Sequence, residues 1–297
     1  MSEDELLALI GRHLPASTAH VPTGDDCTVL APTGQVAVST DILVENVHFR
    51  TDWSSGADVG WRCVMQNVAD AASMRARPMS LVVAMTIPEY VSADWVEDFS
   101  IGLGESCDYL SQLTGPIAID GGDMSRGPII VASGTVLGDM EGREPVLRSG
   151  ARPGDLVIHT GNLGASARGL ELLGQGRTGD ETLLFRRPVP PVDLALAVPA
   201  TAMMDVSDGL VRDSRRIAKK SGVAINLDSQ IISEIASPGV TLEQALTGGE
   251  DHGFLATVRD GSVPSGWTII GTVSEGSGVT VDGVSPTELG GWDHFAG

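Results

Sequence analysis

The chain has 297 residues, of which 42% are hydrophobic and 4% aromatic, so it can bury a core for one large domain or two moderate ones. Its net charge of −20 argues against nucleic acid as a partner, because a polyanion would be repelled over most of the surface. The three cysteines form no C-x-x-C pair, which is typical of free thiols in a reducing, cytoplasmic compartment. No apolar stretch is long enough to cross a membrane, and the acidic N-terminus is not typical of a signal peptide.

Helix-like and strand-like patterns alternate along the chain, which predicts an α/β (α+β) fold. A turn-rich stretch at residues 142–154 interrupts the alternation, so we expect two subdomains, residues 1–145 and 146–297. In chain order, the first half predicts a helix at 1–14, a strand at 35–40, a helix at 58–75, a strand at 80–87, a helix at 93–113 and a strand at 128–137. The second half predicts a strand at 156–159, helices at 165–173 and 210–220, and strands at 254–258, 267–273 and 278–281.

Two familiar nucleotide motifs are excluded by their context. Residues 174–179 fit G-x-G-x-x-G, but a predicted helix precedes them where a strand is required, so we interpret them as a helix C-cap and loop. No glycine is followed by lysine, which excludes a Walker A loop, and the protein-kinase motifs are also missing. A phosphate-transfer reaction in this protein would therefore proceed without the usual lysine.

Six short motifs place carboxylates beside glycines or hydroxyls. Magnesium prefers oxygen ligands and takes one or two carboxylates together with water and phosphate oxygens. Aspartates from several elements could therefore hold several Mg2+ ions along a triphosphate. Each motif also has a bland interpretation as a turn or loop, because Gly and Asp favour turns. The motifs are residues 24–26 (GDD), 39–41 (STD), 67–70 (NVAD), 121–123 (GGD), 205–209 (DVSDG) and 248–251 (GGED).

The motifs differ in how strongly they indicate a site. We place Asp41 at the C-terminal end of a strand, where ligand sites of α/β sheets gather, although a solvated strand end is equally common. Asp70 lies in a helix among small apolar residues with Asn67 on its face, and a carboxylate there is costly unless it is paired or metal-bound. Asp70 is thus the clearest functional candidate of the two.

The remaining motifs are expected to lie in loops. Residues 121–123 precede a predicted strand, and their glycines would let the backbone approach a phosphate, but a turn explains them equally well. Ser207 or Asp208 is a credible N-cap for the helix at 210–220, whose N-terminus would also attract a phosphate. Residues 248–251 lie between a helix and a strand, where a loop and a site are equally plausible.

Taken in order, these motifs resemble the thiamine-monophosphate kinase family, within the superfamily of aminoimidazole-ribonucleotide synthetase. The resemblance runs from about residue 20 to the C-terminus, and eight motifs in one order make it specific. In place of the aromatic and acidic residues that the family usually has after the GGED motif, this chain has His252 and Gly253. The matching segments are residues 24–27, 39–49, 67–74, 121–127, 148–151, 204–210, 248–251 and 292–295.

The resemblance implies transfer of the ATP γ-phosphate to thiamine monophosphate, giving thiamine diphosphate and ADP. It also implies that the N-terminal halves pair into a β-barrel across a homodimer. Implied Mg2+ ligands are Asp26, Ser39, Thr40, Asp41, Asp70, Asp123, Asp205 and Asp208, of which Asp70, Asp123, Asp205 and Asp208 would be catalytic. Implied ATP contacts are Gly122, Asp123, Arg148 and Ser207, and implied contacts to the thiamine moiety are His48, Glu250 and Trp292.

Alternative interpretations stay open at this point. His48 could be a structural histidine, Arg148 a rim salt bridge, and Trp292 an aromatic residue that closes the core. Another ATP enzyme of the superfamily, aminoimidazole-ribonucleotide synthetase above all, is the nearest alternative function. A binding protein that kept the metal sites without turnover is the alternative from a different class.

Overall fold

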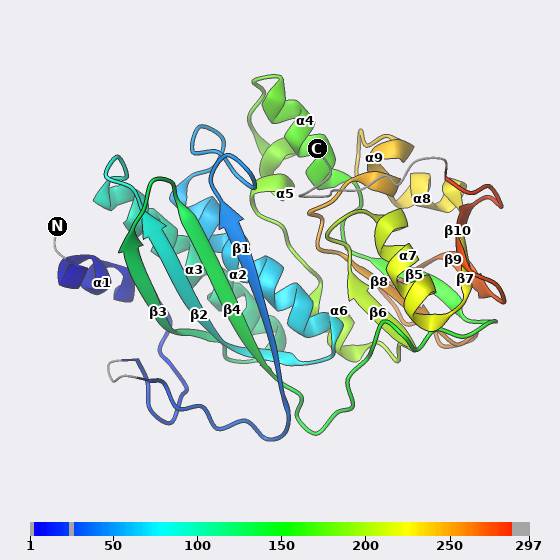
Figure 1. The fold of residues 1–297 in the computed structure, drawn as a ribbon, viewed down its shortest axis with the longest axis horizontal. Coiled ribbons are helices and arrows are strands. Elements are labelled where there is room, and N and C mark those ends of the chain that lie inside the picture. Colours follow the sequence, from blue (N-terminus) through cyan, green and yellow to red (C-terminus); the bar gives the residue numbers. More distant parts are fainter. Residues whose placement is uncertain (1–2, 24–26, 287–297) are drawn as a thin grey trace. The chain divides into compact units, whose positions relative to one another are not determined.

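The chain folds into two compact units, and the computed structural model describes residues 3–23 and 27–286 (Figure 1). Unit 1 comprises Met1–Ala72 and Ala76–Glu144, and unit 2 comprises Ser73–Arg75 and Pro145–Gly297. The predicted site residues Asp26 and Trp292 lie outside the described residues. Across the described residues, no helix has the length and apolar character needed to span a membrane.

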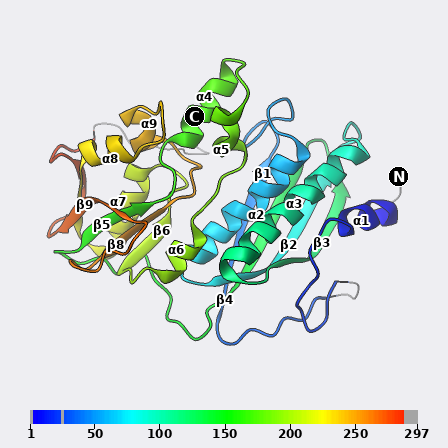
Figure 2. The same ribbon diagram turned by 180° about the vertical axis from the view of Figure 1, so that it is seen from behind.

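Within its described residues, unit 1 is a four-stranded sheet in the order β1-β4-β2-β3, with α2 and α3 across one face (Figures 1 and 2). β4 runs antiparallel to both neighbours, whereas β3 runs parallel to β2 because α3 returns the chain across the sheet. The elements are α1 (Glu3–Gly11), β1 (Val36–Val44), α2 (Gly56–Ser73), β2 (Arg77–Ile87), α3 (Ala93–Thr114), β3 (Ala118–Arg126) and β4 (Val131–Asp139).

Glycines let α2 and α3 approach backbone to backbone. A Cβ atom added at Gly60 of α2 would lie 2.1 Å from the carbonyl oxygen of Phe99, and one at Gly102 of α3 would lie 2.1 Å from that of Ala57. Side chains larger than hydrogen therefore do not fit at these two positions. The close crossing fixes α2, which carries Asp70, against its neighbouring helix.

The other face of the unit 1 sheet carries exposed apolar side chains. Val38 and Ile42 of β1 are 64% and 49% exposed, whereas Leu43, on the helix-covered face, is 1% exposed. Successive strand residues alternate between faces, so β1 turns Val38 and Ile42 outward, whereas Ser39, Asp41 and Leu43 lie on the face that the helices cover.

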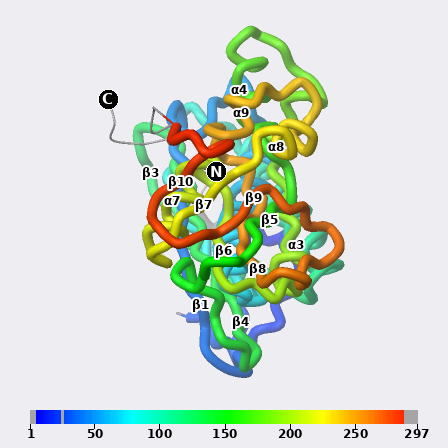
Figure 3. The backbone as a smooth tube through the Cα atoms, turned by 90° about the vertical axis from the view of Figure 1, so that its right-hand side faces the viewer, coloured from blue at the N-terminus to red at the C-terminus, as the bar shows by residue number. Residues whose placement is uncertain are grey.

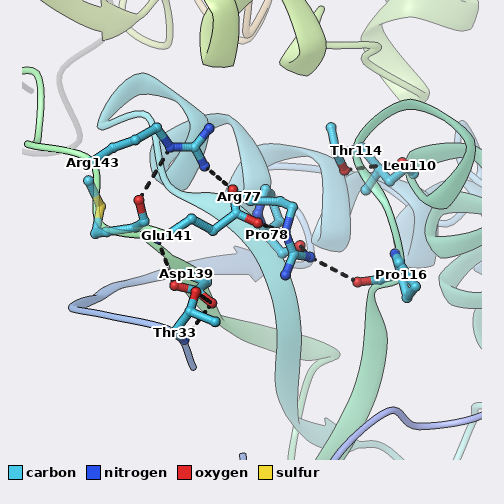
Figure 4. Close-up of polar contacts among 10 residues, drawn as sticks. Thr33, Arg77, Pro78, Leu110, Thr114, Pro116, Asp139, Glu141 and Arg143 are labelled. Carbon is cyan, nitrogen blue, oxygen red and sulfur yellow. Dashed lines mark hydrogen bonds and ion pairs between the residues drawn. The ribbon is translucent and has the colours of Figure 1, made fainter. Parts of the chain in front are cut away.

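One buried carboxylate secures the far end of the sheet (Figure 4). Asp139 accepts hydrogen bonds from the backbone nitrogen and hydroxyl of Thr33, both at 2.9 Å, and from the backbone nitrogen of Glu141 at 2.8 Å. Burial opposes ionisation, but these donors keep the pKa of Asp139 below its usual value. Glu141 in turn binds Arg77 at 2.7 Å and Arg143 at 2.6 Å. This cluster is structural.

Unit 2 contains, within its described residues, a six-stranded sheet in the order β10-β7-β9-β5-β8-β6, with α7 packed beside β7 and β10 (Figure 3). Its core joins Val157, Met204 and Leu255 of the sheet to Leu210 and Ile217 of α7. The elements are β5 (Leu156–Thr160), α4 (Ala165–Gly174), η1 (Asp180–Thr182), α5 (Leu183–Arg186), α6 (Val192–Ala197), β6 (Ala202–Asp205), α7 (Leu210–Ser221), β7 (Ala224–Leu227), α8 (Ser229–Ile235), α9 (Leu242–Thr247), β8 (Phe254–Val258), β9 (Thr268–Ser274) and β10 (Gly278–Val281).

The structure corrects three local predictions. Residues 121–123 lie inside β3 and not in a loop, because paired glycines are compatible with an edge strand as well as with a turn; the strand predicted after them is β4. Asp41 lies inside β1, which continues to Val44. The N-cap of α7 is Gly209, with φ of 108° and no side-chain capping bond, so neither Ser207 nor Asp208 caps this helix.

We expect Gly60→Ala to destabilise the protein by about 3 kcal/mol, because a rigid backbone carbonyl occupies the space that the methyl group needs. Gly11→Ala is the matched control, since no atom lies within 4 Å of its added Cβ. Urea unfolding followed by circular dichroism measures both. Equal midpoints for Gly60→Ala and the unmutated protein would contradict the close helix crossing.

Candidate active site

In unit 1, a polar cluster lies between β1 and α2. The Ser39 hydroxyl donates to Asp70 Oδ2 at 2.6 Å, and the backbone nitrogen of Asp41 donates to Asn67 Oδ1 at 3.2 Å. Asn67 is fully buried and also donates to the carbonyl oxygen of Cys63 at 2.8 Å. Ser39 and Asp41 are two residues apart on a strand and so share the face that α2 covers. The structure thus brings Ser39 to Asp70 and the backbone of Asp41 to Asn67, three residues earlier on α2.

Thr40 does not join this cluster. It lies on the opposite, exposed face of β1, where its hydroxyl donates to the carbonyl oxygen of Gly134 at 2.8 Å and accepts from Thr135 Oγ1 at 3.0 Å. Gly134 serves the covered face as well, because a Cβ there would lie 2.5 Å from Asn67 Nδ2. The predicted Ser-Thr-Asp ligand set is therefore divided between the two faces of the sheet.

Asp123 lies on the far edge strand of the same sheet. The strand register aligns it with Ala84 of β2, Ser133 of β4 and Ile42 of β1. Three strand spacings of about 4.8 Å separate Asp123 from β1 by about 14 Å. Asp123 is exposed, and the register places it on the outward face with Ile42. The structure therefore does not bring Asp123 to Asp70.

An apolar cavity of about 480 Å³ lies beside Asp123. Leu7 and Ile10 of α1, Phe99 and Leu103 of α3, and residues 121–124 of β3 are among its lining. Gly122, a predicted ATP contact, lines it too, so two predicted phosphate-binding residues stand at the rim of an apolar pocket. A flat apolar ring with a polar extension fits such a lining.

In unit 2, the loop after β6 and the loop before β8 are hydrogen-bonded to each other through their backbones. The nitrogen of Val206 donates to the carbonyl oxygen of Gly253 at 2.8 Å, and the nitrogen of His252 donates to that of Val206 at 3.0 Å. The nitrogen of Glu250 donates to the carbonyl oxygen of Ser207 at 2.8 Å. This ladder brings the predicted residues Asp205, Ser207 and Glu250 into one place.

Asp208 is held by a pair of residues on α7 that the sequence analysis did not identify. Arg216 donates a hydrogen bond from Nη2 to Asp208 Oδ2 and a second one from Nη1 to Asp213 Oδ1 at 2.6 Å. Asp213 is fully buried and also accepts from the backbone nitrogen of Asp208 at 3.1 Å. Burial, together with the nearby Asp205 carboxylate, raises the pKa of Asp213 to about 7. The i, i+3 spacing of Asp213 and Arg216 was the available signal.

His252 lies between the two other carboxylates of this cluster. It is buried, with Nδ1 at 3.4 Å from Asp205 Oδ2 and Nε2 at 3.3 Å from Glu250 Oε2. Burial alone would lower its pKa, but the hydrogen bonds to Asp205 and Glu250 raise it to about 10. Sequence analysis identified this position only as a departure from the family pattern.

Asp251 has a different role from its neighbour Glu250. Its buried carboxylate accepts from the backbone nitrogen of Gly164 at 2.5 Å and from that of Ser166 at 2.8 Å. These donors belong to the start of α4, so Asp251 caps that helix from a distant loop. Burial raises its pKa to about 6. Asp251 is therefore structural.

Two other predicted contact residues, His48 and Arg148, lie in loops outside the clusters described above. His48 is half-buried, and its Nδ1 accepts from the backbone nitrogen of Val44 at 3.0 Å. Its carbonyl oxygen accepts from buried Arg62 at 2.8 Å, so the loop position of His48 is fixed. Arg148 is exposed in the loop before β5, where its carbonyl oxygen accepts from the Ser221 hydroxyl at 2.9 Å.

The donor sets of both units suit Mg2+. They consist of oxygen atoms, from Ser39, Asp41 and Asp70 in unit 1 and from Asp205 and Asp208 in unit 2. The described residues contain no group of three or more His, Cys, Asp or Glu side chains that would enclose a metal ion. Mg2+ needs no such cage, because it keeps several waters and takes one or two carboxylates plus phosphate oxygens.

Comparison with known proteins identifies the family of both halves of the chain. Residues 24–140 match the family AIR synthase related protein, N-terminal domain, and residues 152–283 match its C-terminal domain. A thiamine-monophosphate kinase of Mycobacterium tuberculosis is 39% identical over 96% of this chain and 88% of that protein. AaThiL complexed with AMPPCP and TMP has a TM-score of 0.78 and 30% identity, over 99% of this chain and 97% of that one. Hydrogenase maturation protein HypE in complex with ATP shares the fold at 18% identity, with a TM-score of 0.76.

Both halves of the chain thus define a member of the AIR synthase related family, with the two-sheet α/β fold of that family. Within it, the chain belongs to the thiamine-monophosphate kinases. The resemblance seen in the ordered motifs is confirmed.

We expect Arg216→Met to destabilise the protein by about 3 kcal/mol, because it leaves the buried Asp213 carboxylate without its cation. Arg177→Met is the control: that arginine pairs with Glu181 at the surface, and its loss should cost less than about 1 kcal/mol. Urea unfolding midpoints compare the two. Similar midpoints for both variants would contradict the role of Arg216.

Proposed function

We propose that this protein is a magnesium-dependent kinase that transfers the ATP γ-phosphate directly to thiamine monophosphate, giving thiamine diphosphate and ADP. The observation that carries the proposal is the likeness, at 30% identity over 99% of the chain, to AaThiL complexed with AMPPCP and TMP. AMPPCP is a non-hydrolysable ATP analogue, so that complex pairs a phosphate donor with an acceptor. We place the reaction in the cytoplasm, in keeping with the free thiols of the chain.

We assign ATP and magnesium binding and dimerisation to the domain formed by residues 1–145, and we describe residues 146–297 as a C-terminal α/β domain that supplies further candidate ligands. When bound, Mg2+ neutralises the charges whose repulsion opposes transfer between two phosphates. Five proposed Mg2+ ligands form hydrogen bonds to other protein groups. They are Ser39, Asp41, Asp70, Asp205 and Asp208. Asp26 and Asp123 complete the proposed ligand set, and Thr40, which lies on the outward face of β1, is not included in it.

We propose that the apolar cavity of unit 1 takes the adenine ring. Its volume of about 480 Å³ suits a planar base, and its lining from α1 and α3 is apolar. Gly122 and Asp123 stand at its rim, so the phosphates of a bound nucleotide would extend over them. Arg148 and Ser207 are the further proposed phosphate contacts, and His48, Glu250 and Trp292 the proposed contacts to thiamine.

The acceptor needs no general base from this protein. The second pKa of a phosphate monoester is about 6, so the attacking oxygen already carries its charge at neutral pH. Two histidines near the predicted site have ring nitrogens that already contact protein groups. Both ring nitrogens of His252 contact carboxylates, and Nδ1 of His48 accepts a hydrogen bond from the backbone of Val44. The residues of the site therefore act by positioning and by balancing charge.

The test is product analysis after incubation with ATP, thiamine monophosphate and magnesium. We expect thiamine diphosphate and ADP in equal amounts, none from unphosphorylated thiamine, and no turnover in excess EDTA. Asp70→Asn should remove activity while the far-ultraviolet circular dichroism spectrum is unchanged, whereas Asp52→Asn, which is exposed and bound to Arg50, should not. ATP binding without any diphosphate formation would refute the kinase proposal.

We propose that two copies pair through the exposed face of the unit 1 sheet, forming a β-barrel across a homodimer. Val38→Asp should then convert the dimer to a monomer in light scattering, because a buried charge in an apolar interface is unfavourable. Val29→Asp is the control, since Val29 is 46% exposed outside the sheet. An unmutated protein of monomeric mass would contradict the barrel.

A further inference from the structure

We infer that His252 is a positioning residue, which holds the carboxylates of Asp205 and Glu250 in fixed orientations on either side of its ring. The inference rests on the proposed function, in which Asp205 binds magnesium and Glu250 faces thiamine. A residue that touches both would link the orientation of the phosphate-transfer groups to that of the substrate contact. His252 itself would contact neither substrate.

Asp205 is buried beside His252. Its carboxylate is 4% exposed, and among the described residues its hydrogen-bonding side-chain partner is His252. A buried carboxylate without a donor is costly, so the imidazole both stabilises and orients it. Groups that hydrogen-bond to metal-binding side chains commonly set the geometry of those side chains.

The backbone of this loop contributes to the same arrangement. Glu250 adopts a positive φ of 66°, which residues other than Gly, Asn, Asp and His rarely do, and His252 follows with a φ of 52°. The intervening Asp251 points to the start of α4, while the ladder to Val206 and Ser207 fixes the loop. The strained backbone thus turns alternate side chains in opposite directions, and it directs those of residues 250 and 252 toward each other. Strain retained at such a place indicates a functional constraint.

A second buried histidine supplies the comparison. His159 of β5 is 2% exposed, and its Nε2 has no hydrogen-bond partner among the described residues. Burial lowers its pKa to about 4, so its ring is neutral and apolar in effect. Both histidines are buried in unit 2, but only His252 has carboxylates as hydrogen-bond partners among the described residues.

The experiment compares His252→Phe, His252→Gln and His159→Phe in thiamine diphosphate formation and in the melting temperature with and without Mg2+ and AMPPCP. We expect His252→Phe to lower kcat about 10–100-fold, to raise the half-saturating magnesium concentration, and to reduce the melting shift produced by Mg2+–AMPPCP. His252→Gln, which keeps an amide donor, should recover part of each. His159→Phe should leave all three readouts unchanged.

The outcomes separate this inference from the proposed function. An unmutated protein without kinase activity refutes the function. An active protein whose His252→Phe and His252→Gln variants keep kcat, magnesium dependence and melting shift refutes the positioning role. If the phenylalanine variant does not fold, His252→Gln alone decides: a raised half-saturating magnesium concentration supports the role, and an unchanged one overturns it.

Discussion

Burying a carboxylate costs free energy unless a donor reaches it, and this constraint governs the candidate site. Asp70 has the Ser39 hydroxyl, Asp208 has Arg216, and Asp205 has His252. Each donor lies on a different helix, strand or loop from the carboxylate that it contacts. The acidic groups are therefore oriented by the protein before any ligand arrives, which is the condition for catalysis by preorganised charge.

Close backbone approach is the second requirement, and glycine meets it at specific points. Gly134 leaves room for the amide of Asn67, and Gly249 approaches the carbonyl oxygen of Ser207, where an added Cβ would lie 2.5 Å away. In the first case the glycine admits a side chain that holds the backbone of Asp41. In the second it lets two loops form the ladder that positions Glu250. The abundant glycine of the sequence thus serves the geometry of the site.

Periodicity in the sequence predicted most of the long elements of unit 1, including α2 with Asp70. It did not predict β6 and β7, which are four-residue strands with little pattern, although it did predict the equally short β10. Grouping Ser39, Thr40 and Asp41 as one ligand set overlooked strand alternation, which a period of two already implies. The separation of Asp123 from Asp70 depends on strand order, and a sequence does not state which strands become neighbours.

The partners of the carboxylates were harder to predict for a physical reason. Asp213 and Arg216 follow the pattern of an exposed helical ion pair, yet Asp213 is fully buried, and burial is decided by packing of distant residues. His252 faces a residue 47 positions away. The local sequence therefore indicated which residues carry charge. It did not indicate which residues would contact them, because those contacts form only in the tertiary structure.

The two departures from the family pattern are best understood together. Gly253 has no side chain, and a Cβ there would lie 2.7 Å from the carbonyl oxygen of Thr160, so rigid backbone occupies the space that a larger residue would need. At position 252, the imidazole supplies a hydrogen-bonding group between the carboxylates of Asp205 and Glu250. In a chain with a net charge of −20, a donor between two carboxylates offsets their mutual repulsion, and the glycine beside it lets their loop pass close to the end of β5.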